Sequence, residues 1–89
     1  MRYRNVIGSQ VRRMRSARCW TQQQVAIKLQ CLGWDVSREA VAEIERRNYG
    51  LHDLQLLYLA DVFGVAISEL YPPIRFRNRD INEVMKDRL

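Results

Sequence analysis

Cys19, Cys31 and His52 are the residues of this chain whose side chains most readily bind a metal ion or act in nucleophilic catalysis. None has a close-spaced Cys or His partner of the kind that zinc sites use. No Ser-His-Asp, Cys-His or paired-carboxylate arrangement has a supporting sequence context either. A lone cysteine pair without a secretory signal is typical of reduced, half-buried thiols. We therefore expect no metal, no cofactor and no enzymatic activity.

The basic residues are concentrated at the two ends of the chain. Residues 1–18 hold six arginines and no acidic residue, residues 75–88 hold five basic and three acidic residues, and the middle is net acidic. This distribution favours a polyanionic partner, although a basic surface that only improves solubility is an equally good reading of the charge alone.

The length of 89 residues and the hydrophobic content of 47% indicate one small domain. No apolar run approaches the ~20 residues that span a bilayer, and no apolar segment follows Met1 to Arg4 as in a signal peptide. We therefore expect a cytoplasmic protein without a membrane partner.

The spacing of apolar residues predicts two helices in the first part of the chain. Val6, Ile7, Val11 and Met14 lie on one helix face, with Asn5 as the expected cap. Thr21 and Gln24 form a capping box that begins a second helix. Its expected buried face consists of Val25, Leu29 and Leu32.

The pattern continues to the end of the chain without a strand. Ser37 begins a third helix with Val41 and Ile44 inward, and it ends where Asn48 or Gly50 takes a left-handed conformation. A fourth helix begins at His52 or Asp53 and ends at Gly64, with a core face expected from four residues: Leu54, Leu57, Ala60 and Phe63. Ser68 caps a short fifth helix before Pro72-Pro73, and Asp80 with Glu83 caps a tail helix. The predicted fold class is all-α.

The order of these features resembles Xre-type, lambda-repressor-like helix-turn-helix DNA-binding domains over roughly residues 6–71. The resemblance is carried by IGSQVRRMRSARCWTQQQVAIKL, VSREAVAEIERR and DLQLLYLADVFGVAISEL. Its most specific positions are Gly8, Arg15, Thr21-Gln22 with Ala26, Val36-Ser37, Ile44-Glu45, and Ala60 with Phe63-Gly64-Val65. It implies a helix-turn-helix DNA-binding domain at 6–71, where the pattern predicts five helices. We assign a basic arm to 1–5 and a tail to 72–89, predicted helical from 80 by its own cap.

The resemblance also implies which residues contact DNA. The third helix would enter the major groove with its first turn toward the bases. The base-reading positions are then Arg38, Glu39, Ala40 and Glu43. Arginine suits guanine, glutamate suits cytosine N4, and the alanine methyl suits thymine. The phosphate-binding positions are Thr21, Gln22 and Gln23 at the start of the second helix, and Arg46, Arg47 and Asn48 after the third.

Two further expectations concern how the helices are held. In the family, the residues that match Arg15 and Glu45 form an ion pair between the first and third helices. Where the family has a single glycine, this chain has QCLGWD, residues 30–35. We expect residues 30–32 to extend the second helix, Gly33 to end it, Trp34 to fold back over the core, and Asp35 or Ser37 to cap the third helix.

The predicted function is that of a sequence-specific, double-stranded DNA-binding transcriptional regulator of bacterial or phage type, such as a repressor. It would act as a homodimer on a palindromic operator, with possible dimer contacts at Tyr71, Ile81, Val84 and Met85. The aromatic residues have core-like spacing, so no small-molecule ligand is expected. The alternative is a protein-interaction module, antitoxin-like or an adaptor, whose tail binds a partner. Charge reversal at Arg38 distinguishes the two readings.

Overall fold

The computed structural model describes residues 3–73, which form four α-helices and one 3-10 helix, with no strand in that range. The elements are α1 (Gly8–Ala17), α2 (Gln22–Cys31), α3 (Arg38–Glu45), α4 (Asp53–Phe63) and the 3-10 helix η1 (Ile67–Leu70). The all-α prediction is confirmed. The fifth helix is a 3-10 turn that begins one residue before Ser68, and the predicted tail helix from residue 80 lies outside the described residues.

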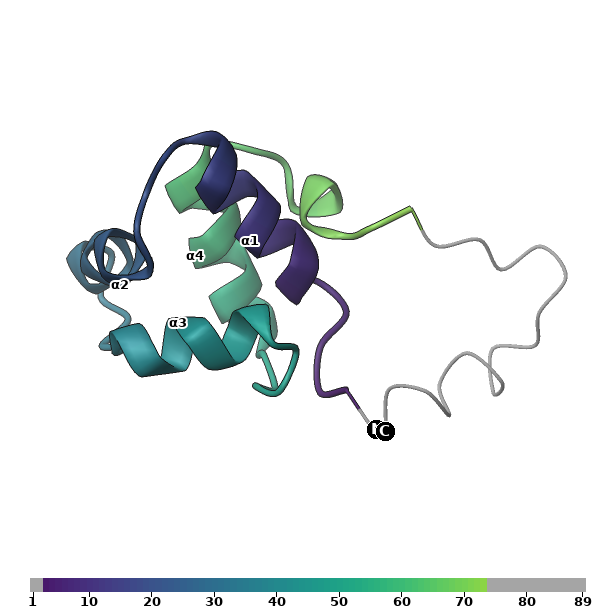
Figure 1. Ribbon diagram of the computed structural model, residues 1–89, viewed down its shortest axis with the longest axis horizontal. Coiled ribbons are helices and arrows are strands. Elements are labelled where there is room, and N and C mark those ends of the chain that lie inside the picture. The colour runs from purple at the N-terminus through teal and green to yellow at the C-terminus, as the bar shows by residue number, and fades with distance from the viewer. Residues whose placement is uncertain (1–2, 74–89) are drawn as a thin grey trace, which may run out of the picture.

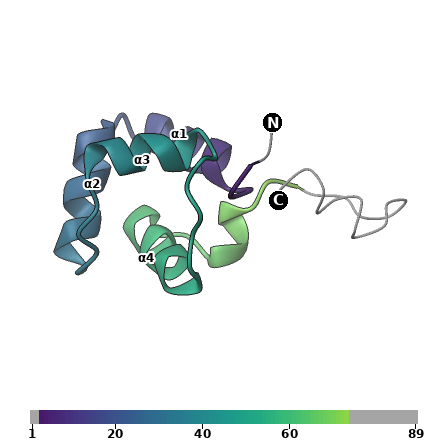
Figure 2. The same ribbon diagram turned by 90° about the horizontal axis from the view of Figure 1, so that it is seen from below.

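The helices pack in two layers around one core. α3 contacts α1 and α2, while α4 contacts α1, α2 and η1. Figure 1 shows α2 and α3 meeting at one end of the molecule, and Figure 2 shows α4 on the opposite side of the core from α3. The largest fully buried side chains are Ile7, Leu29, Ile44, Leu59, Leu70, Val11, Val25 and Val41.

Two predicted core faces were wrong in part. Leu32 is exposed at the end of α2, and Ala26 is buried beside Val25 and Leu29 instead. On α4, Leu54 and Leu57 are exposed, whereas the buried residues are Leu59, Ala60 and Phe63. This helix has leucine on several faces, so the contacts with α1 and α2 decide which face is buried.

Asn5 anchors the chain ahead of α1. Its side-chain Oδ1 accepts hydrogen bonds from the N–H groups of Ile7 at 3.1 Å and Gly8 at 2.8 Å. Its Nδ2 donates to the carbonyls of Ile44 at 3.2 Å and Tyr49 at 2.9 Å. Asn5 therefore satisfies the first turn as predicted, although the residue at the N-cap position is Ile7. The same side chain ties the start of α1 to the end of α3.

All four α-helices end in the same pair of backbone hydrogen bonds, the Schellman motif. After each helix the N–H groups of two successive residues bond back to helix carbonyls; the pairs are Cys19-Trp20, Gly33-Trp34, Arg47-Asn48 and Gly64-Val65. The first residue of each pair has a positive φ: 57° at Cys19, 105° at Gly33, 65° at Arg47 and 67° at Gly64. The predicted ends at Gly33 and Gly64 are confirmed. The expectation that Asn48 or Gly50 turns the chain after α3 was wrong, because Arg47 does so.

The long joint between α2 and α3 is built as predicted, except that α2 ends one residue earlier, with Leu32 as its C-cap. α2 runs to Cys31, Gly33 ends it, and Ser37 caps α3 by accepting from the N–H of Ala40 at 3.0 Å. The Trp34 ring lies 6.4 Å from the ring centroids of both Tyr49 and Tyr58. Gln30 Nε2 closes the joint by donating to the carbonyl of Val36 at 2.7 Å. The additional residues thus form a packed loop.

Candidate nucleic-acid interface

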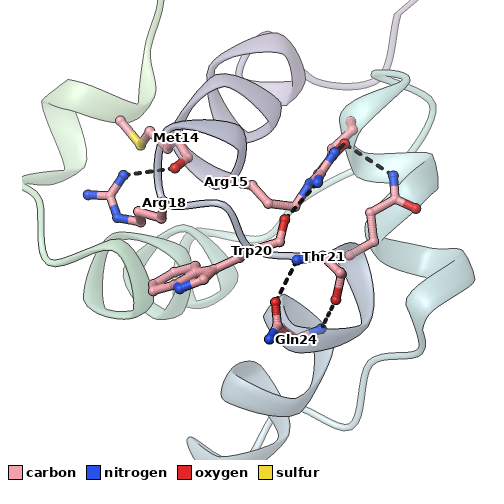
Figure 3. A network of polar contacts seen from close by, with 8 residues as sticks. Met14, Arg15, Arg18, Trp20, Thr21 and Gln24 are labelled. Carbon is pink, nitrogen blue, oxygen red and sulfur yellow. Dashed lines mark hydrogen bonds and ion pairs between the residues drawn. The ribbon is translucent and has the colours of Figure 1, made fainter.

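A capping box forms the N-terminus of α2. Thr21 Oγ1 accepts from the N–H of Gln24 at 3.0 Å, and Gln24 Oε1 accepts from the N–H of Thr21 at 2.7 Å (Figure 3). In any α-helix the N–H groups of the first turn lack partners within the helix and carry partial positive charge. The cap leaves those of Gln22 and Gln23 facing outward, and this arrangement suits an anion such as a phosphate.

A buried ion pair lies directly beside this helix end. Arg15 Nε and Nη2 donate to the two carboxylate oxygens of Glu45 at 2.6 and 3.1 Å, while Nη1 donates to the Trp20 carbonyl at 2.9 Å. The side chain of Glu45 is only 3% exposed and that of Arg15 17%. The hydrogen bonding of its guanidinium to the Glu45 carboxylate is the main cause that raises the pKa of Arg15. The two residues therefore join α1 to α3 as a charged, hydrogen-bonded pair.

Glu45 also orients the side chain of Gln22. Gln22 Nε2 donates to Glu45 Oε1 at 3.1 Å. A glutamine amide nitrogen carries two hydrogens, so one remains for a second acceptor after this contact. The Gln22 amide is thus fixed at the start of α2 with a free donor.

Three arginines surround this amide in a shallow polar hollow of about 290 Å³. Its lining consists of Arg12, Arg15, Gln22, Ala42, Glu45 and Arg46, from α1, α2 and the end of α3. Arg12 was not among the predicted site residues. Its spacing of three from Arg15 was the available signal, because residues three apart lie on one helix face.

The exposed face of α3 carries its charges in pairs. Arg38 Nη2 lies 3.2 Å from Glu39 Oε1, and both side chains are exposed. Glu43 accepts from Asn48 Nδ2 at 2.8 Å and from Arg46 Nη1. The bond from Asn48 and then that from Arg46 lower the pKa of Glu43. Both carboxylate oxygens of Glu43 are therefore engaged within the protein, and Ala40 is half-buried against the core.

Arg47, which follows α3, contacts the N-terminal segment. Its guanidinium stacks 4.0 Å from the Tyr3 ring centroid, and its Nε donates to the Asn5 carbonyl at 3.1 Å. Its own carbonyl accepts from the N–H of Arg4 at 2.8 Å. Arg47 therefore holds the N-terminal segment, and the phosphate contact expected for it stays a prediction.

Solved structures with a similar fold identify the arrangement. The restriction-modification controller protein C.AhdI from Aeromonas hydrophila matches with a TM-score of 0.64 and 23% identity over 73% of this chain and 87% of that one. The DNA-binding domain of BldD matches with a TM-score of 0.64 and 28% identity over 79% and 94%. The hypothetical transcription factor NHTF from Neisseria matches with a TM-score of 0.67 and 24% identity over 94% and 83%.

The chain therefore has the Xre-type, lambda-repressor-like helix-turn-helix fold. No protein-family model matches the sequence, and no curated protein does. Within the helix-turn-helix, α2 and α3 are the helix pair, and the packed loop of residues 32–37 takes the place of the short turn.

The remaining predicted positions lie at the surface or beyond the described range. Thr21, Gln23 and Asn48 are exposed, and Tyr71 is exposed after η1. Ile81, Val84 and Met85 lie outside the described residues. Cys19 and Cys31 are free and exposed, so the expectation of half-buried thiols was wrong. No helix within residues 3–73 is both long enough and apolar enough to cross a bilayer.

Proposed function

We propose that the protein binds double-stranded DNA in a sequence-specific manner and regulates transcription, as a regulator of bacterial or phage type. The observation that carries the proposal is the polar hollow in which Arg12, Gln22 and Arg46 meet at the open N-terminus of α2. The likeness to the DNA-binding domain of BldD, at 28% identity, supports the same reading. A helix start with free N–H groups and nearby guanidinium groups is the chemistry that binds a phosphodiester.

Phosphate binding in this proposal uses residues from three helices. The N–H groups of Gln22 and Gln23, the free amide hydrogen of Gln22 and the Thr21 hydroxyl contact one phosphate. Arg12 and Arg46, which line the hollow, add positive charge. Because Glu45 fixes the Gln22 amide before DNA arrives, little side-chain entropy is lost on binding. Asn48 belongs to the flank of the same surface.

Base recognition is assigned to the first turn of α3. Arg38 donates bidentately to guanine, Glu39 accepts from cytosine N4, and Ala40 contacts a thymine methyl group. The Arg38–Glu39 contact is exposed on both sides, and such a pair is worth at most about 1 kcal/mol, so DNA can displace it. Glu43 contributes chiefly by orienting Arg46 and Asn48, because those residues occupy its oxygens.

A homodimer on a palindromic operator completes the proposal. A single α3 reads few base pairs, and a second copy adds a half-site ~34 Å away along the duplex. Tyr71, with Ile81, Val84 and Met85 of the tail, is the proposed set of dimer contacts.

The test is selection of binding sites from a random duplex library, followed by the affinity for the winning sequence at several salt concentrations. We expect a palindromic winner whose binding weakens steeply with salt, as counterions are released from the phosphates. Arg38→Gln should relax the preference at one position of the site. The absence of any enriched sequence would refute the proposal and favour the protein-interaction module.

Adjacent arginines on α1 provide a matched control for the phosphate contacts. Arg12 lines the hollow, whereas its exposed neighbour Arg13 does not. Arg12→Gln should weaken binding to all duplexes and reduce by about one the slope of log affinity against log salt concentration. Arg13→Gln should change the affinity and this slope much less. Equal effects of the two substitutions would mean that the hollow does not contact DNA.

A further inference from the structure

An apolar groove lies on α4 and η1, beside the core. Leu54, Leu57 and Ile67 are 53%, 51% and 37% exposed. Together with Asp53 and Leu56 they line a hollow of about 340 Å³. Exposed apolar surface is costly in water, and contiguous patches of it are characteristic of interaction sites.

The segment of the chain that forms this groove is acidic. Residues 48–73 contain Asp53, Asp61 and Glu69 but no lysine or arginine. Asp53 lines the groove, and Asp61 lies one turn beyond Leu57 on the same face of α4. A second copy that met this groove through a two-fold axis would bring these carboxylates close to their own equivalents. The groove therefore favours an occupant that is both apolar and basic.

The chain supplies such a segment immediately after the groove. Residues 74–79 read Ile-Arg-Phe-Arg-Asn-Arg, with three arginines and no acid. In an extended segment alternate side chains point to opposite sides, so Ile74 and Phe76 would share one side and Arg75 and Arg77 the other. Six extended residues reach about 20 Å, and the segment begins directly after Pro73.

We propose that residues 74–79 bind the α4–η1 groove of their own molecule. Ile74 and Phe76 cover Leu54, Leu57 and Ile67, and the arginines meet the acidic rim that includes Asp53 and Asp61. The proposal does not depend on DNA binding, because it concerns the side of the core opposite α3 (Figure 2).

The two phenylalanines of the chain allow a direct test on the full protein. Phe63 is buried in the core and Phe76 lies in the proposed segment. With 4-fluorophenylalanine at both positions, fluorine NMR gives one signal for each residue. A neutral gadolinium chelate in the solvent accelerates the relaxation of a fluorine nucleus that is exposed to solvent. We expect Phe76 to be protected, and the double substitution Leu54→Ser with Leu57→Ser to increase its relaxation several-fold.

Controls separate this outcome from unfolding and from other occupants. The Phe63 signal must stay protected in the double variant, which shows that the core persists. Ile27→Ser removes an equally exposed apolar side chain from α2 and should leave Phe76 protected. A Phe76 that is open to solvent in the unsubstituted protein overturns the proposal. Protection that increases with protein concentration also overturns it, since the occupant would then come from a second copy.

Discussion

Arg15 and Glu45 lie 30 residues apart in the sequence and join α1 to the end of α3 through two hydrogen-bonded contacts. The same carboxylate accepts from Gln22 at the start of α2. One buried carboxylate therefore fixes the relative positions of three helices, and two of these are the helix-turn-helix pair. Since DNA binding requires α2 and α3 to stand in a defined relation, this contact links stability to the proposed function.

Removal of one partner of this pair should be costly. Glu45→Ala leaves Arg15 charged and largely buried, and we expect the free energy of unfolding to fall by about 3 kcal/mol. The double variant with Arg15→Ala should lose much less than the sum of the two single variants. Urea unfolding of the four proteins of the cycle measures this coupling energy.

The exposed pair Arg38–Glu39 provides the control for that cycle. Both side chains are more than half exposed, so solvent screens their attraction and their coupling should be far smaller. If the Arg15–Glu45 coupling were no larger than that of Arg38–Glu39, the pair would not hold the helices together.

Gly8 should not tolerate a side chain. A Cβ at this position would lie 2.2 Å from the carbonyl oxygen of Ile44 and 2.8 Å from Arg47 Cγ. Alanine favours a helix more than glycine does, but backbone at 2.2 Å must move apart, so Gly8→Ala should lower the free energy of unfolding by about 2 kcal/mol. Gly50→Ala is the control, because within residues 3–73 no heavy atom beyond its two chain neighbours lies within 4 Å of that Cβ. Thermal unfolding should separate the two variants; equal stability would contradict the close crossing of α1 and α3.

Local signals explain what could be predicted from the sequence. The caps at Thr21 and Ser37 depend on side chains within three residues of the backbone groups they bond, so the sequence alone contains them. The long 30–35 joint was predicted for the same reason, because Gly33 and Ser37 act locally.

The sequence predictions were wrong where contacts between residues distant in the sequence determine the structure. On α4, Leu54 and Leu57 fit a helical core face as well as Leu56 and Leu59 do, and only the packing against α1 and α2 selects the second pair. Arg47 takes the left-handed conformation that usually favours glycine or asparagine, since contacts with Tyr3 and Asn5 hold it there. Such contacts join segments some 42 residues apart and leave no local pattern.

Cys19 should be replaceable by glycine with a gain in stability. Its φ of 57° is left-handed and its side chain is exposed, so the Cβ brings strain without a core contact. Removal of this strain should raise the free energy of unfolding by about 1 kcal/mol in Cys19→Gly. Cys19→Ser removes the thiol but keeps the Cβ and should gain nothing. If the glycine variant were no more stable than the serine variant in chemical denaturation, the backbone at Cys19 would not be strained.

The contribution of Glu43 to stability should depend on pH because of its two hydrogen-bond partners. Asn48 and then Arg46 donate to its carboxylate and hold its pKa below the ordinary value of 4.5. Because the pKa of Glu43 is lower in the folded protein than in the unfolded chain, the bonds to its carboxylate stabilise the fold fully at pH values above the unfolded pKa. This stabilisation is lost as the pH falls through the folded pKa. Asn48→Ala should therefore raise the pKa of Glu43, and the stability difference from the unsubstituted protein should vanish at low pH. Carboxyl carbon NMR titration measures the pKa directly, with Gln23→Ala as a control that removes an exposed amide elsewhere. A Glu43 pKa that is the same in Asn48→Ala as in the unsubstituted protein would show that Asn48 does not orient this carboxylate in solution.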